Sequence, residues 1–283
     1  MFQRIMLNNK IILLTGATDG IGKQTAFELA ERSAVLLMHG KNINKGLGIR
    51  DEIIAKTGNT NVFYFNADFS SFQEIEELSM NIHKKFSHID ILINNAGIYE
   101  NEKIILDRGI EKNLMVNHLA AFSLTLQLLD LIEKSKNARI INVSSMIHAS
   151  SIDFENLNGE KHYSGDYAYS LTKLCNILFT YELSNKLKNN NITVNALHPG
   201  VINTKLLRAG WGGVGNSTAE GAKRIIYLSD SNDVGNITGK YFMNDSTTKS
   251  SDITYDENIR KRLWDISLKY SNHKSKILLS CYN

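Results

Sequence analysis

Short apolar segments alternate with longer amphipathic segments along most of the chain. The apolar segments predict strands at residues 11–15, 34–38, 61–66, 89–94, 139–143, 193–197 and 241–243. Helical spacing of apolar residues predicts helices at 21–32, 43–57, 71–86, 104–134, 167–188, 217–229 and 257–271. This alternation is typical of right-handed βαβ units, so we expect an α/β fold with a doubly wound parallel sheet and helices on both of its faces.

The composition narrows the classes of protein that fit this pattern. The 283 residues are 42% hydrophobic with one proline, which excludes a disordered linker or a collagen-like chain. A net charge of +3 over the whole length excludes a basic stripe for nucleic acid. No segment approaches 18 apolar residues, and few residues precede the first expected strand, so we expect no membrane span.

The two cysteines, Cys175 and Cys281, cannot form a disulfide framework, and neither has a partner at metal-ligand spacing. We therefore expect a reducing, cytoplasmic setting and no bound metal. No linker interrupts the pattern. We expect one domain over 1–283, with a cofactor half at 10–145, a catalytic and substrate half at 146–271 and a tail at 272–283.

A glycine-containing turn follows the first expected strand and leads directly into a helix. Glycine permits a tight turn and close backbone approach, and a helix N-terminus offers unpaired N–H groups to a pyrophosphate. A plain glycine-rich turn is the alternative. The expected cofactor-binding residues of this turn are Gly16, Thr18, Asp19, Gly20, Ile21 and Gly22.

The ends of the second and third expected strands bear on the choice of nucleotide. A carboxylate after the second strand would indicate NAD, but the sequence there includes Gly40 and Lys41. Lys41 and Lys23 would favour the 2′-phosphate of NADP(H), and a solvated surface lysine is the alternative for each. Asp68 could accept a hydrogen bond from the adenine amino group, or could simply cap a loop.

The fourth expected strand is followed by Asn95, Ala96 and Gly97, where small residues would let the chain pass close to a cofactor or simply make a turn. Tyr169 and Lys173, four residues apart, share one face of an expected helix. An ammonium group beside a phenol favours the phenolate and lowers its pKa. A strand-end serine, Ser145, could hold a carbonyl oxygen by a hydrogen bond.

Taken in order, these motifs resemble those of classical short-chain dehydrogenases/reductases over residues 10–270. The matching segments are TGATDGIG at 15–22, NNAG at 94–97, Asn117, SS at 144–145, YSLTK at 169–173, HPG at 198–200 and Thr204. Within the family the chain most resembles the retinol-dehydrogenase-like branch. That branch is indicated by GIGK at 20–23, VNH at 116–118, NVSS at 142–145, NGEK at 158–161, KLCNILF at 173–179 and RLW at 262–264.

The resemblance implies a Rossmann-type sheet with strand order 3-2-1-4-5-6-7 and a role for each matching residue. Tyr169 resembles the family's catalytic acid/base, and Lys173 the residue that lowers its pKa and holds the nicotinamide ribose. Ser145 resembles the carbonyl-orienting residue, and Asn117 the residue that holds a water of the proton relay. The residues implied around the nicotinamide amide are Pro199, Gly200 and Thr204.

The substrate side is less specific. The segment 206–215 is apolar and glycine-rich, which predicts a mobile loop in which Trp211 covers an apolar substrate or simply packs on the surface. Ile98, Met146 and Ile147 could line the same pocket or belong to the core. His148 and His162 are expected near the site without a chemical role. The tail at 277–281 is apolar and could cover the pocket, meet a partner or touch a membrane.

The leading interpretation is therefore an NADP(H)-dependent oxidoreductase that prefers NADP(H) to NAD(H). It would transfer a hydride between nicotinamide and an alcohol or carbonyl group of a small apolar substrate. Two alternatives stay open: a non-catalytic nucleotide sensor or scaffold on the same fold, and a C=C reductase with the same Tyr and Lys. The helices around 114–132 and 169–183 carry more apolar residues than one face needs, which a homodimer or burial within one subunit would explain.

Overall fold

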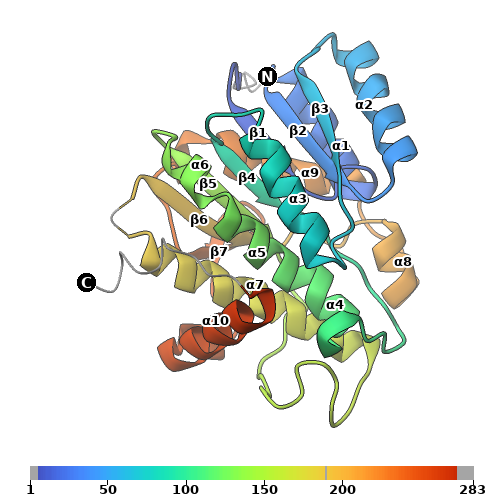
Figure 1. The fold of residues 1–283 in the computed structure, drawn as a ribbon, viewed down its shortest axis with the longest axis vertical. Coiled ribbons are helices and arrows are strands. Elements are labelled where there is room, and N and C mark those ends of the chain that lie inside the picture. Colours follow the sequence, from blue (N-terminus) through green and yellow to red (C-terminus); the bar gives the residue numbers. More distant parts are fainter. Residues whose placement is uncertain (1–5, 189, 273–283) are drawn as a thin grey trace.

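In the computed structural model, which describes residues 6–188 and 190–272, eight strands form one sheet (Figure 1). The strands are β1 (Ile11–Leu14), β2 (Val35–Gly40), β3 (Val62–Asn66), β4 (Ile91–Asn94), β5 (Ala138–Val143), β6 (Ile192–Leu197), β7 (Lys240–Met243) and β8 (Ser246–Thr248). Their order is 3-2-1-4-5-6-7-8, and the first seven are parallel. The expected doubly wound sheet and its order are confirmed.

The strand β8 was not predicted. It pairs antiparallel with β7 through a two-residue turn in which Asn244 and Asp245 both have positive φ, 53° and 62°. This backbone conformation matches the right-handed twist of a hairpin, and Asn and Asp adopt it more readily than most residues do. The three residues of β8 are too few and too polar to stand out as a strand in the sequence.

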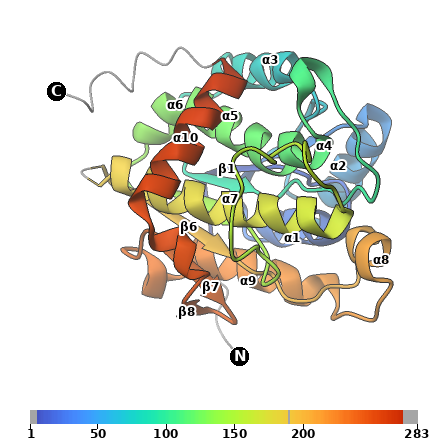
Figure 2. The same cartoon turned by 90° about the horizontal axis from the view of Figure 1, so that it is seen from below.

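Helices cover both faces of the sheet, as expected (Figure 2). One face carries α1 (Gly20–Glu31), α2 (Ile43–Thr57) and α9 (Thr218–Asp230), and the other carries α3 (Phe72–His83), α5 (Ala120–Gln127), α7 (Gly165–Lys186) and α10 (Glu257–Ser271). Alternate residues of one strand belong to the two cores: Leu13 packs on the α5 and α7 side, whereas Ile12 and Leu14 pack on the α1 and α9 side. Because residues on both faces of β1 are buried, this strand is apolar at consecutive positions.

The prediction of a single helix over 104–134 was wrong at its start. Residues Arg108 and Gly109 both have positive φ, and Ile105 bridges to Glu111, so this part folds back on itself. The helix begins after Glu111, whose carboxylate accepts the N–H of Leu114 at 2.9 Å. It continues as α4 (Lys112–Leu114), a π-helical turn (Met115–Leu119), α5 and α6 (Leu129–Glu133).

The prediction of a mobile loop at 206–215 was also wrong. The segment contains most of a short helix, α8 (Lys205–Trp211), that begins at Thr204 and ends at Gly212 in the left-handed conformation. The hydroxyl of Thr204 accepts the N–H of Leu207 at 3.2 Å and so caps the helix. Among the described residues, no helix combines the length and the apolar character needed to cross a membrane. Cys281 and the segment 277–281 lie outside the described residues.

The buried carboxylate of Asp90 joins three segments at the amino-terminal end of β4. It accepts hydrogen bonds from the backbone N–H of Ile11 at 2.9 Å, from Ser135 Oγ at 2.7 Å and from Lys10 Nζ at 3.0 Å. Burial acts to raise the pKa of Asp90, but these bonds outweigh it and hold the pKa below its ordinary value. The ionised form is therefore the one that the fold stabilises.

We expect Asp90→Ala to lower the free energy of unfolding by about 1–3 kcal/mol, because it leaves buried donors without an acceptor. Because the pKa is lowered by folding, this contribution is present above the unfolded pKa of about 4 and is lost as the pH falls through the folded value. Urea unfolding at several pH values measures both effects. Asp51, whose side chain is 63% exposed, provides the control: Asp51→Ala should change stability by less than about 0.5 kcal/mol.

Candidate active site

The turn after β1 has the conformation that its glycines predict. Gly16 and Gly20 have φ of +66° and +50°, and a Cβ on Gly22 would lie 2.1 Å from the carbonyl oxygen of Gly16. The carboxylate of Asp19 accepts the N–H of Gly20 at 2.8 Å and begins α1. A side chain at these glycine positions would strain the turn or separate it from the helix.

Hydrogen bonds tie this turn to the segment that follows β4. The Thr15 hydroxyl oxygen accepts the N–H groups of Asn95 and Ala96 at 2.9 and 3.0 Å. The side-chain amide of Asn95 donates to the carbonyl oxygens of Thr15 and Gly16 at 2.9 and 3.2 Å. A Cβ on Gly16 would lie 2.8 Å from Ala96 Cα. The two segments that the sequence assigns to the cofactor therefore lie against each other.

Both segments line a cleft of about 800 Å³ at the carboxyl ends of the strands, a volume suited to a small-molecule ligand. Of the predicted site residues, those that line it are Gly16, Thr18, Asp19, Gly20, Ile21, Gly22, Gly40, Lys41, Asp68, Asn95, Ala96, Gly97, Ser145, Tyr169, Lys173, Pro199, Gly200 and Thr204. Two predicted residues, Lys23 and Asn117, do not line it. Among the described residues, no group of three or more His, Cys, Asp or Glu side chains could hold a metal ion.

The cations at this end of the cleft are arranged differently from the prediction. Lys41 lines the cleft and is exposed, whereas Lys23 lies in a separate cavity and pairs with Glu52 at 2.8 Å. Lys45 also lines the cleft, although the sequence reasoning missed it. The clue was Asn42, whose side chain accepts the N–H of Lys45 at 2.9 Å and so places this lysine in the first turn of α2.

The carboxylate of Asp19 pairs with two lysines from distant parts of the chain. Lys45 Nζ lies 2.7 Å and Lys205 Nζ 3.1 Å from Asp19 Oδ2. Partial burial acts to raise the pKa of Asp19, but the hydrogen bonds with Lys45 and Lys205 lower it to about 2. The glycine turn, α2 and α8 are thus joined through one carboxylate.

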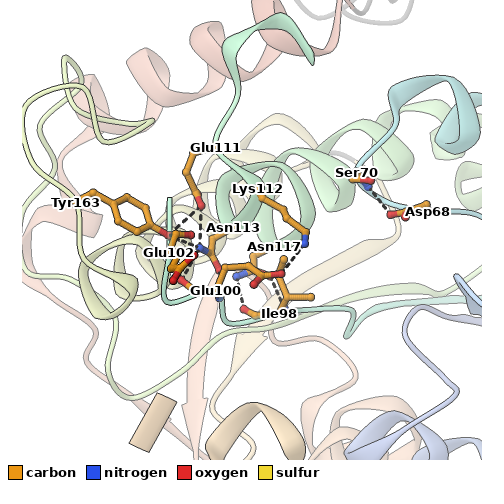
Figure 3. A network of polar contacts seen from close by, with 10 residues as sticks. All are labelled: Asp68, Ser70, Ile98, Glu100, Glu102, Glu111, Lys112, Asn113, Asn117 and Tyr163. Atoms are coloured by element: carbon orange, nitrogen blue, oxygen red, sulfur yellow. Dashed lines mark hydrogen bonds and ion pairs between the residues drawn. The ribbon is translucent and has the colours of Figure 1, made fainter. Parts of the chain in front are cut away.

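Asp68 lines the cleft near another group of charges (Figure 3). Its Oδ1 accepts the N–H of Ser70 at 2.9 Å. Burial acts to raise the pKa of Asp68, but the hydrogen bonds with Ser70 and the charges of Lys41 and Lys112 outweigh it and lower the pKa. Lys112, a second residue that the sequence reasoning missed, lines the cleft and pairs with Glu100 at 2.6 Å.

His39 is a third missed residue. Its ring is 3% exposed, stacks on Phe69 with 3.9 Å between centroids, and accepts the N–H of Gly16 at Nδ1 (3.4 Å). Nε2 lies 3.0 Å from the carbonyl oxygen of Ala67, which assigns the proton to Nε2. Burial lowers the pKa of His39 to about 4, so the ring is neutral at pH 7. It connects the glycine turn with the ends of β2 and β3.

At the other end of the cleft, the proposed catalytic side chains come from β5 and α7. Ser145 follows β5, while Tyr169 and Lys173 lie one turn apart on α7, and all three are buried. Lys173 Nζ donates to the carbonyl oxygen of Val143 at 3.1 Å and lies 5.3 Å from the centre of the Tyr169 ring. Ser144 Oγ donates to the carbonyl oxygen of Lys173 at 2.7 Å, which anchors α7 to the end of β5.

Burial dominates the electrostatics of these groups in the protein alone. It raises the pKa of Tyr169 well above the ordinary value, and a hydrogen bond with Ser145 offsets part of this rise. It lowers the pKa of Lys173 to about 8. The lowering of the tyrosine pKa expected from Lys173 is therefore not seen here, because desolvation disfavours both charged forms.

Asn117 lies behind the cleft wall, on the π-helical turn. A Cβ on Gly97 would lie 3.5 Å both from Asn117 Oδ1 and from Lys173 Nζ, so these two groups approach the same glycine. The Asn117 amide donates to Thr172 Oγ1 at 3.1 Å, which joins the turn to α7. A π-helical turn inside an α-helix is frequent at functional sites.

The substrate side of the cleft is apolar and aromatic. Trp211 of α8 lines it and packs edge-on against Tyr169, with ring centroids 5.3 Å apart. Ile98, Met146 and Ile147 line it too, as the sequence suggested, and the last two are exposed at its edge.

The two histidines expected near the site do not line the cleft. His148 donates from Nδ1 to the carbonyl oxygen of Ser145 at 2.8 Å and accepts the N–H of Ser251 at Nε2 (3.0 Å). It therefore supports the backbone at the end of β5. His162 contacts Asn156 and the ring of Tyr167, farther along the same connection.

The strand order and the contents of the cleft agree with a comparison against known families. The family model of short chain dehydrogenases matches residues 10–211. The chain belongs to this family of oxidoreductases.

Individual relatives define the branch. Human retinol dehydrogenase 11 is 34% identical over 273 residues, which cover 93% of this chain and 86% of the relative. The predicted resemblance to the retinol-dehydrogenase-like branch is thereby confirmed. A putative uncharacterized protein from Mycobacterium paratuberculosis has a similar structure, with a TM-score of 0.79, 26% identity and 95% coverage of both chains. A putative short chain dehydrogenase from Escherichia coli CFT073, solved with NADPH, shares the fold with a TM-score of 0.71, 23% identity and coverage of 85% of this chain and 98% of that one.

We expect the ring protons of His39 to keep constant chemical shifts in an NMR titration from pH 8 to about 5.5, because burial keeps the ring neutral to about pH 4. Since the unfolded ring titrates near pH 6.5, this group reduces stability as the pH falls from about 6.5 to 4. The signal is assigned by its loss in His39→Gln. An inflection near pH 6.5 would show that the ring is solvated and does not bond Gly16 and Ala67.

Proposed function

We propose that the protein is an NADP(H)-dependent oxidoreductase that transfers a hydride between nicotinamide and an alcohol or carbonyl group of an apolar substrate. The observation that carries the proposal is the meeting of Ser145, Tyr169 and Lys173 in the cleft that the glycine turn also lines. A general acid/base, its neighbouring cation and a hydroxyl donor are the groups that a carbonyl reduction requires from the protein. Membership of the family supports this reading.

The residues present fit a dinucleotide phosphate. A Cβ on Gly16, Gly22 or Gly40 would collide with Ala96, the Gly16 carbonyl oxygen or Thr18, so the glycines keep these segments closely packed where they line the cleft. No carboxylate follows β2, while Lys41 and Lys45 line the cleft there. This charge balance favours a cofactor with a 2′-phosphate over one with a free ribose hydroxyl. The NADPH named for the E. coli structure supports the same cofactor.

Each catalytic residue then has a defined task. The nicotinamide, when bound, supplies or accepts the hydride. The Ser145 hydroxyl holds the substrate oxygen, and Tyr169 gives that oxygen its proton in reduction or removes it in oxidation. Lys173, whose pKa burial lowers only to about 8, stays mainly protonated at pH 7, so its ammonium group stabilises the phenolate. Asn117 supports the relay that returns the proton from solvent.

The apolar lining selects the kind of substrate. Trp211, Ile98, Met146 and Ile147 face the same cleft as Tyr169, so an alcohol or aldehyde with a large apolar body fits better than a polar one. The names of the retinol dehydrogenase relatives support a retinoid-like substrate. A single domain with a cytoplasmic location is part of the same proposal, carried by the sequence arguments. Nearly all apolar residues of α5 and α7 are buried within this one chain, so they give no argument for the homodimer.

We expect Tyr169→Phe to reduce kcat at least about 100-fold, because it removes the only proton that the ring can exchange. The Kd for NADPH should change less than about twofold, since the aromatic ring stays in place. Loss of reduced-nicotinamide absorbance with retinoid, aliphatic and steroid aldehydes or ketones measures turnover, and titration of NADPH fluorescence measures binding. Turnover retained in Tyr169→Phe would refute the assignment of the acid/base.

We expect Lys41→Ala and Lys45→Ala each to raise the Kd for NADPH about tenfold, because each removes a charge-assisted contact with phosphate. The Kd for NADH should stay within about twofold. Lys23→Ala is the matched comparison, because this lysine pairs with Glu52 outside the cleft, and its removal should affect neither cofactor. Equal weakening of NADH and NADPH would contradict the proposed phosphate contact, and an effect of Lys23→Ala would restore the original sequence prediction.

A further inference from the structure

Two asparagine side chains hold alternate residues of the segment 98–100, just after β4 (Figure 3). The Asn117 amide accepts the N–H of Ile98 at 2.7 Å and donates to the carbonyl oxygen of the same residue at 3.0 Å. The Asn113 amide accepts the N–H of Glu100 at 3.0 Å and donates to its carbonyl oxygen at 3.3 Å. Each side chain thus satisfies both polar groups of one backbone residue, much as a neighbouring strand would.

The orientation of the Asn113 amide is fixed by its other partners. Its Nδ2 also lies 2.9 Å from Glu111 Oε1 and 3.1 Å from the Tyr163 hydroxyl. A carboxylate accepts hydrogen bonds, so the donor end of the amide must face Glu111 and its acceptor end must face the N–H of Glu100. Asn113 is fully buried, and Glu111 is 1% exposed. This environment leaves the amide one arrangement.

The residue between the two held positions is Tyr99. Its ring lies 6.0 Å from that of Tyr169 and 5.1 Å from that of Trp211, measured between centroids. Its hydroxyl donates to Asp166 Oδ1 at 2.9 Å. A Cβ on Gly210 would lie 3.1 Å from the Tyr99 ring, so α8 packs closely on it. Trp211 lines the cleft and Tyr99 does not, so the backbone position of 98–100 supports the Trp211 side of the cleft through the Tyr99 ring.

We propose that Asn113 is a positioning residue for the substrate pocket: together with Asn117 it fixes the segment 98–100 and so holds the Tyr99 ring against those of Tyr169 and Trp211. Asn113 does not line the cleft, so it acts only through this segment. The inference rests on the proposed oxidoreductase function, because the pocket concerned is that of the proposed substrate. Its consequence is a residue that sets substrate affinity without touching the substrate, the cofactor or the reacting atoms.

The kinetic test compares Asn113→Ala with the unmodified full-length protein. We expect the KM for the carbonyl substrate to rise about tenfold, while kcat and the Kd for NADPH stay within about threefold, because uniform binding in the pocket is lost but the chemistry is not. Asn195→Ala is the matched control. Asn195 is also buried, accepts the N–H of Lys240 at 3.1 Å and donates to the carbonyl oxygen of Ile237 at 2.6 Å, on another part of the sheet.

A second readout does not depend on activity. The chain has two tryptophans, Trp211 beside Tyr99 and Trp264 buried in the core, so labelling with 5-fluorotryptophan gives two ¹⁹F resonances that Trp211→Phe assigns. We expect Asn113→Ala to move or broaden the Trp211 resonance and to leave that of Trp264 unchanged. Asn195→Ala should change neither KM nor the Trp211 resonance, even if it lowers stability as much.

The outcomes separate the two proposals. If the unmodified protein turns over no substrate, that result contradicts the proposed function. The Trp211 resonance then still shows whether Asn113 positions the Tyr99 ring. An unchanged KM and an unmoved Trp211 resonance in Asn113→Ala would overturn the inference, as would equal changes in Asn195→Ala. If Asn113→Ala does not fold, Asn113→Ser replaces it, because the shorter side chain cannot bond both backbone groups of Glu100: a raised KM and a moved Trp211 resonance support the inference, and their absence overturns it.

Discussion

The hydrogen bonds between Thr15 and the Asn95–Ala96 backbone are the constraint on which the site depends. They join the ends of β1 and β4, the neighbouring strands at which the order of the sheet reverses from 1-2-3 to 4-5-6. Connections leave these two strands on opposite faces, which opens a crevice between them. The glycine turn and the segment after β4 both line the cleft there, and the Thr15 hydroxyl together with the Asn95 amide fixes how closely they approach.

Much of the fold follows from local pattern. The strands β1 and β4 are almost continuously apolar because both of their faces are buried, and the structure places all seven parallel strands within two residues of their predicted bounds. The errors occur where tertiary contacts override pattern. Residues 104–111 read as helical, but Arg108 and Gly109 adopt a left-handed conformation that ends any helix. In the segment 206–215 the glycines predict a loop, yet Thr204 caps a helix whose Trp211 is held by two aromatic rings.

Some residues of the candidate site are likewise predictable from the local sequence, and others are not. The glycine turn and the Tyr169–Lys173 pair are encoded by short spacings within one element, and reading them needs no knowledge of the rest of the chain. His39 and Asn113 could not be recognised so, because each acts through a partner 10 or more residues away, Gly16 and Glu100. Lys45 had a local clue in Asn42, but its pairing with Asp19 is a long-range contact. Burial reverses the expected pKa direction of Tyr169 for a similar reason, since depth in the fold is a tertiary property.

Asp19 carries a consequence for how the cleft responds to anions. Its one carboxylate already pairs with both Lys45 and Lys205, so a phosphate that binds Lys45 competes with Asp19 for the same ammonium group. The free energy gained is the difference between two pairings, and it is smaller than the number of lysines around the cleft suggests. Lys205 belongs to α8, so the Lys205–Asp19 pair is one contact that joins the helix carrying Trp211 to the glycine turn. Dissolved salt screens the pairing with Asp19 as well as a contact with phosphate, so its two effects on anion affinity act in opposite directions.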